Sequence, residues 1–206
     1  MNGKFITFEG PEGSGKTSVI KDVVKNLQSQ GYDVLTTREP GGIKISEAIR
    51  DIILNTENVE MDITTEALLF AASRRQHIVE KIWPALRQGK IVICDRFVDS
   101  SLAYQGVGRK LGIDKVYAIN QYAIEGCLPD LTIFIDLPPE IGLKRVFSNN
   151  RKVDRLDLET ISFHEKVYEG YQEIIRQYAD RIKAVDGTQS LEKVVEAAMK
   201  WIQTIL

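Results

Sequence analysis

Eight residues, Gly10 to Thr17, read GPEGSGKT and lie between a predicted strand and a predicted helix. Residues 5–8 (FITF) form a short apolar run typical of a buried strand, and apolar residues recur at helical spacing from Val19 to Leu27. The segment fits the pattern G-x-x-x-x-G-K-[ST], whose glycines let the backbone curl so that successive N–H groups point inward. Such a loop joins a strand to a helix, so the segment predicts an α/β fold.

The same alternation continues along the 206-residue chain. Further strands are predicted at 33–37, 91–94, 131–136 and 182–185, and further helices at 43–54, 64–88, 114–126, 138–147, 157–179 and 190–205. Pro84 should bend or interrupt the helix in which it lies. Strands that alternate with helices form a parallel sheet covered on both faces. We therefore expect a three-layer P-loop NTPase fold, with a five-stranded parallel sheet flanked by helices, in a single domain over residues 1–206.

Charge and hydrophobicity limit the partners of this chain. Its formal net charge of −2 argues against a broad electrostatic grip on nucleic acid. No apolar run approaches membrane-spanning length, and no secretory or transit pattern precedes the first strand. We expect a cytoplasmic protein that binds neither nucleic acid nor a membrane. Cys94 and Cys127 fit buried thiols of a reducing compartment, and His77 and His164 fit packing or surface roles better than a metal site.

The loop itself predicts binding of a nucleoside triphosphate. Inward N–H groups and the positive end of the following helix attract phosphate oxygens. Lys16 would neutralise charge between the outer phosphates, and the Thr17 hydroxyl would bind Mg²⁺. We assign ATP binding to Gly10, Glu12, Gly13, Ser14, Gly15, Lys16, Thr17 and Ser18. The loop does not identify the group that receives the phosphate.

An acid–arginine pair follows the predicted strand at 91–94. Ligands of open α/β sheets bind at the carboxyl ends of strands, so Asp95 is placed to hold the metal or its water. Arg96 would face the same cleft and can clamp an acceptor phosphate through two hydrogen bonds. An ordinary surface ion pair is the alternative. Arg38 and Glu39 follow the second strand in the same way, although such side chains are more often solvated.

Five segments together resemble the bacterial thymidylate kinase family. They are Phe8–Thr17, Thr37–Gly42, Phe70–Arg75, Asp95–Gly106 and Asp154–Asp157, in the family's order and across most of the chain. The first alone is unspecific, whereas the third and fourth together are highly specific. The resemblance implies transfer of the γ-phosphoryl group of ATP to dTMP, which gives dTDP and ADP in dTTP biosynthesis. It also implies a need for Mg²⁺ and a homodimer.

The resemblance implies roles for the acceptor site. Phe70 would stack on the pyrimidine, and Arg74, four residues later on the same helix face, would bond its carbonyl edge. Ser101 and Gln105 would contact the base, and Tyr104 would pack beside the deoxyribose. The monophosphate would lie among Arg38, Arg50 and Arg96, the acceptor sugar near Glu12, and the metal shell would include Thr17, Asp95 and Glu39. Without the resemblance, Phe70 would fit core packing, Tyr104 a surface or dimer contact, and Glu12 a loop spacer.

One catalytic arginine has two alternative sources in this family. Residues 11–14 contain no arginine, so the resemblance implies the lid, at about 147–156, as the source. Arg151 and Arg155 lie in that polar stretch and join Lys16, Arg96 and Glu12 as catalytic candidates. Arg145 and the turn at 186–187 are the candidates for the adenine site. Two departures from the family pattern, Ile43 and Phe97, touch no group that the chemistry requires, although Ile43 could alter packing of the turn that holds Glu39.

Two alternatives stay open at this point. A related kinase could use another nucleotide or a deoxynucleoside as the acceptor. A nucleotide-dependent switch or binding module could share the loop without transferring phosphate, but the sequence lacks the N-K-x-D motif of GTPase switches.

Overall fold

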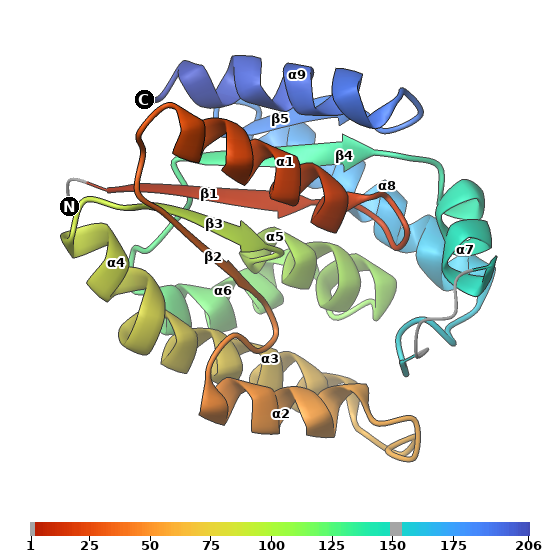
Figure 1. Ribbon diagram of the computed structural model, residues 1–206. Coiled ribbons are helices and arrows are strands. Elements are labelled where there is room, and N and C mark those ends of the chain that lie inside the picture. Colours follow the sequence, from red (N-terminus) through yellow and green to blue (C-terminus); the bar gives the residue numbers. More distant parts are fainter. Residues whose placement is uncertain (1–2, 149–153) are drawn as a thin grey trace.

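The computed structural model describes residues 3–148 and 154–206, which form a sheet with helices on both faces (Figure 1). Across these residues five parallel strands lie in the order β2-β3-β1-β4-β5. They are β1 (Lys4–Glu9), β2 (Val34–Arg38), β3 (Ile91–Asp95), β4 (Leu131–Asp136) and β5 (Ile182–Asp186). The predicted α/β fold class is confirmed, and each strand lies where the apolar runs predict it.

Helices pack against both faces of this sheet. They are α1 (Lys16–Ser29), α2 (Lys44–Leu54), α3 (Ile63–His77), α4 (Trp83–Arg87), α5 (Val98–Ser101), α6 (Ile113–Ile124), α7 (Pro139–Ser148), α8 (Ile161–Gln177) and α9 (Leu191–Gln203), with the π-helices η1 (Ile78–Ile82) and η2 (Leu102–Gly108). In Figure 1, α1 and α9 cover one face and α3, α4 and α6 lie on the other. The layered arrangement is therefore the one that alternating elements predict.

Alternation along β1 shows why apolar residues occur on both faces of the strand. Ile6 and Phe8 pack into the core under α1 and α9, whereas Phe5 packs into a separate core with η1, α4 and Phe97. The rings of Phe5 and Phe97 meet edge to face, 4.9 Å apart. Because successive side chains point to opposite faces, a strand covered on both sides carries apolar residues at both sets of positions.

The helix predicted at 64–88 is divided into three parts. It begins as α3, widens into η1 and continues as α4, in whose first turn Pro84 lies. Proline lacks a backbone N–H and its ring clashes with the preceding turn of an α-helix. The expected interruption is confirmed, and the π-helical turn before Pro84 is the form that it takes.

One helical segment was not predicted. Residues 98–108, which form α5 and η2, follow β3 directly and contain two glycines, so they show no long apolar period. Tertiary contacts stabilise them, because η2 packs closely against α8: a Cβ on Gly170 would lie 2.9 Å from Val107. Helix α8 begins at Ile161 rather than 157, after Thr160, whose side chain accepts a hydrogen bond from the backbone N–H of Phe163.

The predicted lid lies partly outside the described residues. Residues 149–153, with Arg151 among them, lie outside the described residues, and the division into one domain with a lid at 147–156 stays a prediction. Over the described ranges, no helix has the length and apolar character needed to cross a membrane.

Candidate active site

A cavity of about 550 Å³ opens at the carboxyl ends of β1, β2 and β3. One part of its wall is the loop between β1 and α1, and another comes from α2, α3, α5 and η2. Parallel strands direct their carboxyl ends to the same edge of the sheet, which is where open α/β folds bind ligands. Segments that are far apart in sequence therefore converge on one pocket.

The loop at 10–15 has the backbone that phosphate binding requires. Gly10, Gly13 and Gly15 have φ values of 147°, 69° and 90°, a region that side chains rarely tolerate. Gly15 ends the loop, because its carbonyl accepts hydrogen bonds from the first turn of α1. A Cβ on Gly142 would lie 2.0 Å from the carbonyl oxygen of Glu12, so α7 also packs directly on the loop.

Lys16 lies beneath this loop with its side chain largely buried. Its Nζ donates hydrogen bonds to the carbonyl oxygens of Gly10 and Pro11, at 3.0 Å each, and to Ser14 Oγ at 3.3 Å. Burial lowers the pKa of Lys16 to about 8, and the neighbouring charge of Arg96 acts in the same direction. The ammonium group is therefore held where phosphate oxygens would replace protein carbonyls as its partners.

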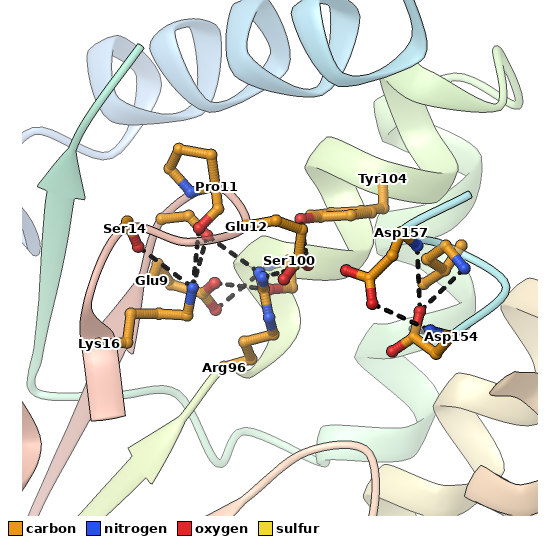
Figure 2. A network of polar contacts seen from close by, with 12 residues as sticks. Glu9, Pro11, Glu12, Ser14, Lys16, Arg96, Ser100, Tyr104, Asp154 and Asp157 are labelled. Atoms are coloured by element: carbon orange, nitrogen blue, oxygen red, sulfur yellow. Dashed lines mark hydrogen bonds and ion pairs between the residues drawn. The ribbon is translucent and has the colours of Figure 1, made fainter. Parts of the chain in front are cut away.

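Arg96 lies at the centre of the polar network in Figure 2. Its backbone is left-handed, with φ at 70°, which turns the side chain back toward the loop. One guanidinium nitrogen donates to Gly10 O, Ser100 Oγ and Tyr171 OH at 3.1–3.2 Å, and the other to Glu12 at 2.6 Å. Burial lowers the pKa of Arg96, but Glu12 and other neighbours outweigh it and hold the pKa well above its usual value.

Glu9 is a buried acid to which the sequence motifs assign no role. Its carboxylate accepts hydrogen bonds from the backbone N–H groups of Phe97 and Ser100, at 2.7 and 3.2 Å, and from the hydroxyl groups of Ser100 and Tyr171. Burial, together with the nearby charge of Asp99, raises the pKa of Glu9 to about 7. Two of its partners are also partners of Arg96, so Glu9 fixes the surroundings of that arginine.

Thr17 and Asp95 provide oxygen atoms at the mouth of the loop. Thr17 Oγ1 lies 3.4 Å from Asp95 Oδ2, and both residues line the cavity. A hydroxyl and a carboxylate that are adjacent and accessible suit Mg²⁺, which takes few protein ligands and completes its shell with phosphates and water. The two residues that the sequence assigned to metal from separate segments are thus brought together.

Glu39, the third predicted metal residue, lines the cavity, but its carboxylate oxygens contact other side chains. Arg74 Nε donates to one of its oxygens at 2.8 Å, and His77 Nδ1 lies 2.9 Å from the other. His77 Nε2 lies 2.7 Å from Thr37 Oγ1, which joins β2 to α3. Glu39 therefore orients Arg74 in this structure, and its place in the metal shell stays a prediction.

Arg38 and Arg50 also line the cavity, as the monophosphate assignment requires. Both nitrogens at the end of Arg38 bond Glu47, at 2.6 and 3.0 Å. Arg50 donates to the carbonyl oxygen of Pro40 at 2.9 Å, and burial, with the charge of Arg38, lowers the pKa of Arg50. Both guanidinium groups stay charged and lie beside the turn after β2.

The predicted base-binding residues lie together on the opposite wall. The structure brings Phe70, Arg74, Ser101, Tyr104 and Gln105 to the same cavity. Arg74 is almost fully buried and donates hydrogen bonds to Glu39, Ser101, Asn120 and the carbonyl oxygen of Phe97. A guanidinium group has five N–H groups, so these four bonds leave one that no described residue occupies and that a ligand can use.

Tyr104 connects the two walls. Its hydroxyl donates to Glu12 at 3.0 Å, and Arg96 lies over its ring, 5.1 Å from the centroid. Burial raises the pKa of Tyr104 well above its usual value, so the hydroxyl stays protonated. Glu12, predicted near the acceptor sugar, is thereby fixed between Tyr104 and Arg96 (Figure 2).

The predicted lid arginine Arg155 does not line the cavity. Its guanidinium bonds the carboxylate of Glu66 and donates to the carbonyl oxygen of Ile53 at 2.8 Å. Contact with a transferring phosphoryl group would require these bonds to break, so a catalytic role for Arg155 stays a prediction. Arg145 lines the cavity, 3.4 Å from the carbonyl oxygen of Gly13. The turn at 186–187 does not line the cavity in the described residues, and its adenine contact also stays a prediction.

Sequence patterns gave no signal for the buried acids behind the pocket. Glu9 and Glu66 carry no motif, and each gains its partners only when distant helices pack together. Gly142 gave no signal either, because its close approach to the loop depends on where α7 packs. Only the placement of Glu9 at the carboxyl end of a predicted strand could have drawn attention to it.

Comparisons with known proteins agree with this geometry. A family model described as thymidylate kinase matches residues 8–198. A thymidylate kinase of Oceanobacillus iheyensis is 59% identical over 207 residues, which cover 100% of this chain and 92% of that protein. A thymidylate kinase of Clostridium novyi is 57% identical over 195 residues, 94% of this chain and 95% of that protein. The crystal structure of thymidylate kinase from Ehrlichia chaffeensis matches with a TM-score of 0.77 and 32% identity, over 98% of both chains.

Proposed function

The chain belongs to the thymidylate kinase family, and we propose that its cavity holds ATP at the phosphate loop and dTMP beside Phe70, end to end. The enzyme transfers the γ-phosphoryl group of ATP to the 5′-phosphate of dTMP and gives dTDP and ADP. One observation carries the assignment of sites: the loop and the base-binding residues line one continuous cavity. Two nucleotides bound at its two ends would bring their phosphates together between Lys16 and Arg96.

At the ATP end, the loop supplies main-chain N–H groups and Lys16 supplies charge. Lys16 would exchange its bonds with Gly10 and Pro11 for bonds with the outer phosphates of ATP. The positive end of α1 acts on the same phosphates. Arg145, on the rim, would approach the adenine.

Thr17 and Asp95 would hold Mg²⁺, for which their adjacent oxygens are suited. When bound, the ion supplies positive charge between the outer phosphates of ATP. Glu39 lines the same cavity, and its backbone N–H bonds the carbonyl oxygen of Asp95 at 3.0 Å, so its carboxylate would take part in the shell through water. A preparation treated with a chelator should lose transfer and regain it when Mg²⁺ is restored.

At the acceptor end, one group of residues would bind the phosphate of dTMP and another would bind its base and sugar. Arg38, Arg50 and Arg96 would bind the 5′-phosphate, Phe70 would stack on the base, and the free N–H of Arg74 would donate to a base carbonyl. Ser101 and Gln105 would contact the rest of the base edge. Tyr104, fixed by Glu12, would occupy the space that a ribose 2′-hydroxyl needs.

The acceptor oxygen is already ionised, so the reaction needs no strong general base. The main barrier is repulsion between two polyanions, and Lys16, Arg96 and the lid arginines disperse that charge in the transition state. Arg151 lies outside the described residues, and Arg155 would have to leave Glu66 to take part. Closure over both substrates would exclude water, which is a competing acceptor.

An acceptor panel tests this function. ADP formation is measured with dTMP, dCMP, dUMP, dAMP, dGMP and thymidine as acceptors, and dTMP should give the highest kcat/KM. Lys16→Ala should abolish transfer with little effect on thermal unfolding, whereas Lys25→Ala, at an exposed lysine of the same helix, should retain activity. Hydrolysis of ATP that is indifferent to all monophosphates would instead identify a switch or binding module.

We also propose a cytoplasmic homodimer. Apolar side chains are exposed on three neighbouring helices: Ile45 and Ile52 of α2, Leu68 of α3, and Tyr122 of α6, which is 92% exposed. Pairing of two chains through these helices would cover them. Two buried free cysteines, Cys94 and Cys127, agree with a reducing compartment. Light scattering should give twice the 23.3 kDa of one chain, and a monomer at micromolar concentration would contradict the assembly.

A further inference from the structure

We propose that Glu66 is a positioning residue that determines base specificity. Its carboxylate holds the carboxamide of Gln105 so that the NH₂ group faces away from the cavity and the carbonyl oxygen faces into it. The cavity then accepts a base with an N–H group at ring position 3, such as thymine, and rejects cytosine, which has a lone pair there. This inference rests on the proposed function, because it requires the base to bind beside Phe70 and Gln105.

Glu66 lies behind the cavity wall and does not line it. Its side chain is 1% exposed, and Gln105 Nε2 donates to its Oε1 at 2.9 Å. Gln105 does line the cavity. In the described part of the chain, this is the one hydrogen bond of the Gln105 carboxamide. Glu66 therefore engages one end of that carboxamide from the side opposite to the ligand.

The charge of Glu66 decides which end of the carboxamide it engages. Burial would raise the pKa of Glu66, but Arg109 and hydrogen bonds from Gln105 and Arg155 outweigh it and lower the pKa below its usual value. An ionised carboxylate can only accept hydrogen bonds. A reversed carboxamide would place two acceptors against each other in a dry site, which is costly. The orientation of Gln105 thus follows from chemistry.

Glu66 is itself held from two sides. Arg109 donates to both of its oxygens, at 3.3 and 3.2 Å, and Arg155 bonds Oε2. Arg109 also pairs with Glu159 at 2.6 Å and lies over the ring of Phe163. Because Arg109 follows η2 directly and Arg155 lies in the segment before α8, the carboxylate cannot turn without breaking several contacts.

The resulting edge of the cavity is a donor beside an acceptor. Arg74 presents its remaining N–H group, and Gln105 presents a carbonyl oxygen. Thymine offers a carbonyl oxygen and a ring N–H, which match both groups. Cytosine offers an amino group and a ring lone pair, which match neither, and unmatched buried polar groups discriminate strongly. Uracil has the same edge as thymine, so Glu66 does not distinguish dUMP from dTMP.

The test compares kcat/KM for dTMP and for dCMP in three variants. Glu66→Gln removes the charge and lets the Gln105 carboxamide turn over, so the ratio of the two values should fall by about tenfold or more, chiefly through KM, while KM for ATP stays near its wild-type value. Glu66→Asp keeps the charge and should retain most of the ratio. Glu159→Gln is the matched control, because it removes the other carboxylate on Arg109 without touching Gln105.

Each outcome decides the matter. An unchanged ratio in Glu66→Gln, or an equal fall in Glu159→Gln, would overturn the inference. If Glu66→Gln does not fold, Gln105→Met removes the carboxamide itself, and a wild-type ratio in that variant would overturn it equally. The proposed function fails separately, if the wild-type enzyme does not prefer dTMP to dCMP at all.

Discussion

Loss of the proton from Lys16 should set an alkaline limit on ATP binding. The Nζ of this lysine is bonded to two carbonyl oxygens and a hydroxyl beneath the phosphate loop, and burial lowers its pKa to about 8. A neutral lysine cannot neutralise the outer phosphates of ATP. Above that pKa, most molecules carry a neutral Lys16, and ATP binding requires that this lysine take up a proton. The apparent affinity for ATP therefore falls as the protonated fraction falls.

The size of the effect follows from the pKa. At about one pH unit above it, roughly one molecule in ten carries the charged lysine, so the apparent affinity for ATP should be about tenfold below its plateau. Glu9, with a pKa of about 7, is already largely ionised in that range. Burial holds the pKa of Tyr104 and of Cys94 well above their usual values, and the phosphates of ATP have lost their last proton already, near pH ~6.

Isothermal titration with a non-hydrolysable ATP analogue and Mg²⁺, from pH 7 to 9.5, measures this limit. The wild-type dissociation constant should rise about tenfold for each pH unit beyond the pKa. Lys16→Ala binds more weakly at neutral pH but should show no such rise, because the titrating group is gone. A wild-type affinity that is flat to pH 9.5, or a parallel fall in Lys16→Ala, would refute the reasoning.

Three further predictions concern single side chains. Phe70→Ala should raise KM for dTMP about tenfold or more by removing the stacking surface, with KM for ATP nearly unchanged in steady-state kinetics. Arg155→Ala should lower kcat much more than it weakens binding of dTMP in single-turnover assays; a wild-type kcat would leave the arginine with a structural role only, through contacts such as those to Glu66 and Ile53. The raised pKa of Glu9 favours folding fully below pH 4.5, and this contribution is lost as pH rises through about 7. It amounts to about 3 kcal/mol of unfolding free energy, so Glu9→Gln should flatten that part of the stability profile in urea titrations.

Strands were the most predictable elements of this fold, because a buried parallel strand is apolar on both faces and short. β1 and β4 lie at the predicted residues, and Phe5 and Ile6 show why, since they enter different cores. The segment at 98–108 could not be predicted, because the spacing of its apolar residues is that of the π-helix η2 and not of an α-helix. Packing against α8 stabilises this π-helix. The spacing of apolar residues therefore predicts only those helices and strands that have a regular apolar face.

The pocket could be predicted in outline from where strands end. Topology brings Asp95 and Arg96 to the loop, and helical spacing puts Phe70 and Arg74 on one face. The resemblance to a known family was needed to choose an acceptor. The pairing of Arg155 with Glu66 could not be foreseen, because it joins a residue of the predicted lid to the first turn of α3.

Three buried glutamates orient side chains of the pocket, and no sequence motif identifies this role. Glu9 holds the hydroxyl groups around Arg96, Glu39 holds Arg74, and Glu66 holds Gln105. In each case a carboxylate that is 1–5% exposed bonds a side chain that lines the cavity or a partner of one. Burial of an acid is costly unless donors surround it, so each must be fully engaged and is therefore rigid. Glu9 and Glu66 are rigid acceptors behind the pocket that orient the side chains at its surface, and they make the pocket selective even though they do not line it. A motif search finds the surface residues, whereas the acids that orient them are found only from packing.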